Sequence, residues 1–115
     1  MSDETPKKID HKLYELIRED KIDDFNKRWD KGERCDMTGL NFRGQDMRKI
    51  NQGGIDFSNC YFRQADLRGL NMSTWLLEGA SIYEANISGA YFPKELSTEE
   101  ILLSISRGTR MRYNR

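Results

Sequence analysis

An apolar residue returns at every fifth position between residues 35 and 94, and this spacing constrains the fold more than any other feature of the chain. A second series, of small or apolar residues, lies two positions earlier; each series has one exception, Gln52 in the first and Gln45 in the second. The first series is Met37, Phe42, Met47, Phe57, Phe62, Leu67, Met72, Leu77, Ile82, Ile87 and Phe92. The second is Cys35, Leu40, Ile50, Ile55, Cys60, Ala65, Leu70, Trp75, Ala80, Ala85 and Ala90.

A period of five fits neither regular secondary structure. On an α-helix, each step of five residues rotates the side-chain direction by roughly 140° beyond a full turn. The apolar side chains would therefore be spread around the whole cylinder. In a straight strand an odd step places successive apolar residues on opposite faces. A backbone that bends once in every repeat keeps them all on one side. The spacing therefore predicts a solenoid with an apolar interior.

Three segments resemble the A(D/N)LXX unit of the pentapeptide repeat family: 65–69 (ADLRG), 85–89 (ANISG) and 55–59 (IDFSN). The resemblance implies a right-handed quadrilateral β-helix with four repeats per coil. Residues 35–94 would then form about three coils, with residues twenty positions apart stacked on one another. The expected fold class is an all-β solenoid capped by short α-helices at both ends. Trp75 stands where this family prefers a small residue, and we expect it to pack against a terminal helix.

The segment before the repeats changes period and is predicted to be a helical cap over residues 9–34. Its apolar residues recur at steps of three and four, which is typical of helices with one buried stripe. They are Leu13, Leu16, Ile17, Ile22, Phe25 and Trp29. Asp10 is the expected cap of the first helix and Gly32 the stop of the second. Residues 1–8 are expected to be disordered.

Residues 95–115 are predicted to form a C-terminal helix and a basic tail. Ser97 and Glu100 match a capping box and Gly108 is a natural stop, so the helix should cover residues 98–107. The tail carries Arg107, Arg110, Arg112 and Arg115. It is interpreted as a frayed basic terminus, with contact to nucleic acid as the alternative.

Composition excludes several classes of function. Lysine and arginine number 19 and so do aspartate and glutamate, which gives no excess charge for nucleic acid or an anionic membrane. No apolar run has the length of a membrane span or a signal peptide, and we expect a cytoplasmic protein that binds neither membrane nor nucleic acid. The sequence also lacks a phosphate-binding loop and a paired metal-ligand motif, so we expect no enzyme activity, no cofactor and no metal.

The outward positions of the repeats distinguish two faces. Asp46 and Arg48 would stack on Asp66 and Arg68, where the charges neutralise each other in a structural role. The neighbouring face carries arginine and tyrosine residues and no carboxylate, which predicts a binding site for a carboxylate or phosphate. They are Arg43, Arg63, Tyr61 and Tyr83. Two independently solvated arginines are the favoured interpretation, and the anion site is the alternative to it.

These features favour a non-catalytic protein-interaction or structural scaffold module whose target the sequence does not identify. The alternative, drawn from the resemblance, is a DNA-mimic regulator of DNA gyrase or topoisomerase. Against it, the outward rows hold as many arginines as acidic residues. A homodimer through the C-terminal helix is expected as well, with Leu103, Met111 and Tyr113 as the interface residues.

Overall fold

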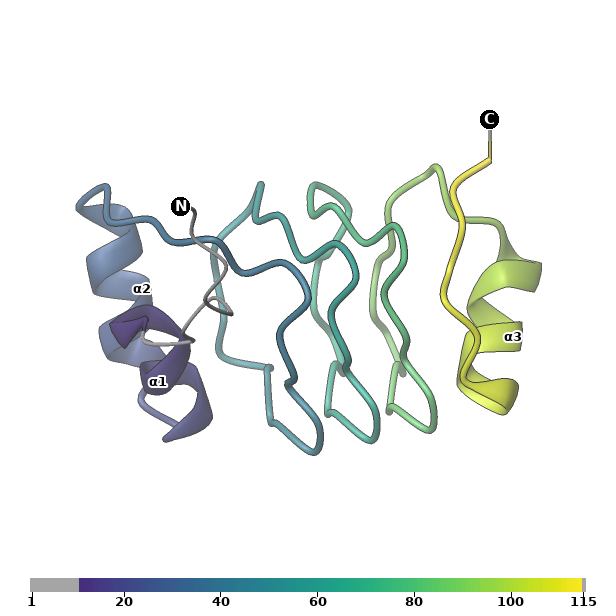
Figure 1. The fold of residues 1–115 in the computed structure, drawn as a ribbon, viewed down its shortest axis with the longest axis horizontal. Coiled ribbons are helices and arrows are strands. Elements are labelled where there is room, and N and C mark those ends of the chain that lie inside the picture. Colours follow the sequence, from purple (N-terminus) through teal and green to yellow (C-terminus); the bar gives the residue numbers. More distant parts are fainter. Residues whose placement is uncertain (1–10, 115) are drawn as a thin grey trace, which may run out of the picture.

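The computed structural model describes residues 11–114, and the chain there contains α1 (Lys12–Arg18), α2 (Ile22–Asp30) and α3 (Thr98–Arg107). The first two helices lie at one end of the molecule and α3 at the other, with residues 35–94 between them (Figure 1). The predicted helices on both sides of the repeats are thus confirmed. The expected disorder of residues 1–8 and the expected cap at Asp10 lie outside the described residues.

The predicted fold class is wrong. The described residues contain no β-strand, so the chain is not the all-β solenoid or right-handed quadrilateral β-helix that the repeats suggested. Pairing is limited to isolated parallel bridges between residues twenty positions apart, such as Asn41 with Tyr61 and Asp66 with Asn86. A turn follows each of these bridged residues within two or three positions. Because the backbone turns in every repeat, no run of consecutive paired residues is long enough to make a strand.

Backbone hydrogen bonds nevertheless hold successive windings of the chain, which we define as residues 35–54, 55–74 and 75–94, at a constant offset. The Phe62 amide donates to the Ser81 carbonyl at 2.8 Å, and the Ser81 amide donates to the Cys60 carbonyl at 3.0 Å. The same pattern links Phe42 to Tyr61 at 2.7 Å. Equivalent residues of successive windings therefore lie beside one another, at the predicted spacing of twenty residues.

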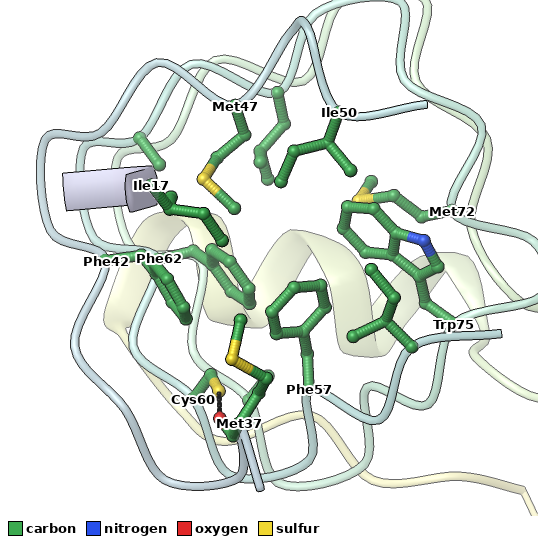
Figure 2. Close-up of a cluster of buried hydrophobic side chains, with 14 of the residues drawn as sticks. Ile17, Met37, Phe42, Met47, Ile50, Phe57, Cys60, Phe62, Met72 and Trp75 are labelled. Carbon is green, nitrogen blue, oxygen red and sulfur yellow. Dashed lines mark hydrogen bonds between the residues drawn. The ribbon is translucent and has the colours of Figure 1, made fainter. Parts of the chain in front are cut away.

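The core lies inside the windings and follows the five-residue pattern. Phe42 and Phe62 stack with their ring centroids 5.4 Å apart and an angle of 11° between the ring planes (Figure 2). Both series of apolar positions are buried as predicted through the first two windings and the start of the third, apart from Cys35. Towards the end of the third winding, Ile87, Ala90 and Phe92 are only partly buried. Burial of this apolar surface is the main force that holds the windings together.

The two exceptions to the pattern have separate structural roles. The Gln45 side chain is buried. Its amide nitrogen donates to Asp20 Oδ1 at 2.7 Å, and its amide oxygen accepts from Arg18 Nη1 at 3.0 Å. These bonds link α1 and the turn between α1 and α2 to the first winding. Near Gln52, the Trp75 indole is buried and donates to the Gln52 backbone carbonyl at 2.8 Å. The ring centroids of Trp75 and Phe57 lie 4.8 Å apart, so Trp75 packs into the core of the windings. Its expected contact with a terminal helix stays a prediction.

The C-terminal segment closes part of the third winding. In α3, Ser97 caps the first turn by accepting from the Glu100 amide, and Gly108 ends the helix with φ 76°, a left-handed conformation that suits glycine. Beyond the helix, the Met111 amide donates to the Ala80 carbonyl at 2.9 Å, and the Met111 carbonyl accepts from the Gly79 amide at 2.7 Å. The chain after Gly108 is therefore docked on the windings, which differs from the frayed tail that the sequence predicted.

Candidate functional site: an arginine–tyrosine face

Stacking of the windings places the predicted binding residues on one side of the molecule. Tyr61 lies in the second winding and is bridged to Asn41 before it and Ser81 after it. Arg43, Arg63 and Tyr83 each follow these bridged residues by two positions and occupy equivalent places in the three windings. Together with Arg110, which the sequence analysis did not include, we call these residues the arginine–tyrosine face: Arg43, Tyr61, Arg63, Tyr83 and Arg110.

Arg63 and Tyr83 form a cation–π pair. The guanidinium carbon of Arg63 lies 4.8 Å from the centroid of the Tyr83 ring. The ring also lies near the end of α3, because a Cβ added at Gly108 would lie 3.4 Å from the ring atoms of Tyr83. The ring thus lies close to both the C-terminal segment and the arginine. The contact orients the guanidinium and leaves its positive charge in place.

Arg110 makes a second pair of the same kind with Tyr61. Its guanidinium carbon lies 4.9 Å from the Tyr61 ring centroid, and Nη2 donates to the Tyr61 hydroxyl. Nη1 donates to the Gly79 carbonyl at 3.0 Å. The signal that could have found Arg110 is the alternation of charged and apolar residues over 110–113, which is typical of an extended segment with one face buried.

Arg43 is held by a polar chain that ends on a carboxylate. Its Nε donates to Gln64 Oε1 at 3.4 Å, and Gln64 Nε2 donates to Glu84 Oε1 at 3.1 Å. The sequence predicted no carboxylate on this face, and Glu84 at its edge corrects that prediction. The Gln64 amide nevertheless stands between the two charges: within residues 11–114, no carboxylate forms an ion pair with Arg43, Arg63 or Arg110.

The neighbouring face shows the opposite arrangement. Arg48 Nη2 contacts Asp46 Oδ2 at 2.8 Å and Arg48 Nε contacts Asp66 Oδ2 at 3.2 Å, while Arg68 Nη2 contacts Asp66 at 2.7 Å. The hydrogen bond from Arg48 lowers the pKa of Asp46 from 3.8 to about 2, and the hydrogen bond from Arg68 lowers the pKa of Asp66. In return, the carboxylates raise the pKa of Arg48 and of Arg68. Here each arginine has its counter-charge within the chain.

The comparison with protein-family models identifies the repeating segment. The model of pentapeptide repeats matches residues 55–93 with 8 copies. Residues 55–93 are pentapeptide repeats. The match confirms the resemblance on which the sequence analysis relied. It leaves out residues 35–54, where Gln45, Gln52 and the pair Gly53-Gly54 depart from the regular unit. The comparisons with curated proteins and with solved structures found no match.

The residues predicted for a dimer interface lie beside the last pentapeptide repeats, but they differ in exposure. Leu103 on α3 is exposed, whereas Met111 is fully buried within its own chain. Tyr113 is half-buried, and its hydroxyl accepts from the Leu77 amide at 2.9 Å. Two of the three side chains thus make contacts inside the molecule. Self-association through the C-terminal helix stays a prediction that would depend mainly on Leu103.

Among residues 11–114 no helix is long and apolar enough to span a bilayer. In the same range, histidine, cysteine and acidic side chains do not gather in a group of three or more that could hold a metal ion.

Proposed function

We propose that the chain is a non-catalytic interaction module that binds an acidic segment of another protein through the arginine–tyrosine face. Pentapeptide repeats suggest a scaffold or interaction module, and the repeats here span residues 55–93. The observation that carries the specific proposal is the contrast between two adjacent faces. Arg48 and Arg68 are paired with aspartates, whereas Arg43, Arg63 and Arg110 are held by neutral groups.

Electrostatics favours an anion at this face. Adjacent windings are about 4.8 Å apart where they hydrogen-bond, so Arg43 and Arg63 extend from neighbouring positions with like charges. Two unit charges about 5 Å apart repel by roughly 0.8 kcal/mol in water. A carboxylate between them would replace this repulsion with two charge-assisted hydrogen bonds. Because neighbouring residues already hold the guanidinium groups of Arg63 and Arg110, little conformational entropy is lost on binding.

The arrangement gives less support to the DNA-mimic alternative. A protein that imitates a duplex needs a continuous negative surface, since the duplex carries one charge per roughly 1.7 Å of its axis. Here one side presents three arginines without an ion-pair partner in the described residues, and the next presents aspartates that their own arginines neutralise. An acidic ligand fits this pattern better than a basic DNA-binding enzyme does.

Titration calorimetry with a glutamate-rich peptide tests the proposal. The variant Arg43→Gln, Arg63→Gln should bind the peptide much more weakly than the native chain, because it lacks two of the three arginines. The control, Arg48→Gln, Arg68→Gln, changes the net charge by the same amount on the neighbouring face and should keep the native affinity. Equal weakening in the two double variants would show that only the net charge of the protein matters, and it would reject a specific face.

A further inference from the structure

A groove of about 480 Å³ lies between α3 and the segment that follows it, and the arginine–tyrosine face accounts for only part of its lining. The lining residues are Glu100, Leu103, Thr109, Arg110 and Arg112. Figure 1 shows the two walls side by side, with α3 at the end of the molecule and the C-terminal segment next to it. The volume is within the range of known ligand sites, roughly 300 to 1,000 Å³.

Hydrogen bonds fix both walls of the groove. On the helix side, the fully buried Ser104 hydroxyl accepts from the Ile82 amide at 2.9 Å and donates to the Thr109 carbonyl at 2.6 Å. On the other side, the Met111 backbone is paired with the third winding. The Arg112 amide donates to Glu100 Oε1 at 2.9 Å and joins the two walls directly. The groove is thus formed before any ligand arrives.

The lining combines one apolar side chain with two cations. Leu103 is 42% exposed. On the same helix, Ser104 is fully buried against the third winding, and Ile101 and Ile105 are partly buried against the core. Within the described residues, the guanidinium groups of Arg110 and Arg112 have no carboxylate at ion-pairing distance. Glu100 already accepts the Arg112 amide. The groove therefore offers an apolar contact flanked by two positive charges.

We propose that this groove binds an acidic peptide segment that carries one apolar side chain, with that side chain against Leu103 and its carboxylates towards Arg110 and Arg112. Arginine clusters are a recurrent means of recognising acidic motifs. Glu100 would repel phosphates and carboxylates alike, so the apolar contact at Leu103 is what favours a peptide over nucleic acid. The proposal rests on the proposed function to the extent that Arg110 belongs to both sites, so that one partner segment would contact the groove and the arginine–tyrosine face together.

Fluorescence anisotropy with two labelled peptides tests the groove. The first is glutamate-rich with a leucine near its middle, and the second has serine in place of that leucine. The native chain should bind the first peptide roughly tenfold more tightly, the factor expected when most of a leucine side chain is buried. Leu103→Ser should abolish this preference. Leu102→Ser is the matched control, because Leu102 is the adjacent residue, is 57% exposed and does not line the groove.

The outcomes separate this inference from the proposed function. Loss of affinity in Arg43→Gln, Arg63→Gln with no preference for the leucine peptide supports the face and overturns the groove. A leucine preference that depends on Leu103, together with an affinity that this double variant leaves unchanged, supports the groove and overturns the face. Absence of saturable binding of either peptide overturns the groove. So does a dimer that Leu103→Ser dissociates, because the groove would then be an interface between two copies. Tighter binding of a single-stranded oligonucleotide, unchanged by Leu103→Ser, overturns it as well.

Discussion

The guanidinium carbon of Arg63 lies 4.8 Å from the centre of the Tyr83 ring, which comes twenty residues later in the sequence. The contact exists because the backbone of each winding hydrogen-bonds to the next, here through the Gln64 amide and the Tyr83 carbonyl at 2.8 Å. A cation–π contact at an exposed site is worth about 0.5 to 1 kcal/mol. The same pairing that holds the windings together therefore also brings Arg63 and Tyr83 together on the arginine–tyrosine face.

Sulfate should stabilise the native chain through Arg43 and Arg63. An anion that binds the folded state at about one hundred times its Kd adds about 2.7 kcal/mol to the free energy of unfolding. We expect the Tm of the native chain to rise more with sulfate than the Tm of an Arg43→Ala, Arg63→Ala variant. Scanning calorimetry of the Arg48→Ala, Arg68→Ala variant measures the general salt effect. Identical increases in all three proteins would contradict an anion site.

Truncation of the inward residues should separate them from their outward neighbours. Phe62 and Leu67 are each 1% exposed, so Phe62→Ala should lower the free energy of unfolding by about 3 to 5 kcal/mol and Leu67→Ala by about 2 to 5 kcal/mol. Arg63→Ala and Ser58→Ala should cost at most about 1 kcal/mol, because these side chains point outwards. Urea denaturation measures all four. Similar small losses at the four positions would argue against the five-residue register.

The core was predictable from the sequence because each inward position repeats the same local chemistry. Phe42 and Phe62 occupy equivalent repeats, and periodicity alone places them together. The secondary-structure class was not predictable in this way. Whether Asp66 belongs to a strand or to an isolated bridge depends on how many consecutive residues pair, and that number depends on the turn conformation of each repeat, which a hydrophobic pattern does not contain.

The candidate site was predicted only as far as the repeats extend. Arg43, Arg63, Tyr61 and Tyr83 follow from the stacking, whereas Arg110 reaches Tyr61 through a chain reversal after Gly108. The position of that reversal depends on long-range contacts, such as the one between Met111 and Ala80. Similarly, Glu84 reaches the site through the side chain of Gln64, and no spacing rule specifies a side-chain rotamer.

Acid should lower the free energy of unfolding by protonating Asp46 and Asp66. Their folded-state pKa values lie below the ordinary 3.8, at about 2 for Asp46, so their ion pairs contribute fully above about pH 4 and are lost as the pH falls towards about 2. The loss should not exceed about 1 kcal/mol, because the Asp46 side chain is 47% exposed and solvent screens the pair. Urea titrations from about pH 5 to about pH 2 measure it against Asp46→Asn, Asp66→Asn. This variant should lose less stability over the interval, and parallel curves would exclude the aspartates as the cause.

Ser104 should be essential to the attachment of α3, although serine is usually a surface residue. Its side chain is fully buried and makes two hydrogen bonds: it accepts one from the Ile82 amide and donates one to the Thr109 carbonyl. Ser104→Ala leaves the Ile82 amide buried without an acceptor, which should lower the free energy of unfolding by about 1 to 3 kcal/mol. It should also accelerate hydrogen exchange at Ile82, because α3 would separate more readily from the third winding.

The control for this change is Ser106→Ala on the same helix. The Ser106 hydroxyl is exposed and donates to the Leu102 carbonyl at 2.8 Å, one turn earlier in α3. Its removal should change the free energy of unfolding by less than about 0.5 kcal/mol, since alanine also has the higher helix propensity. Chemical denaturation and amide exchange of both variants decide the matter. If Ser104→Ala were as mild as Ser106→Ala, and exchange at Ile82 did not change, the buried hydroxyl would not be what holds the C-terminal helix on the windings.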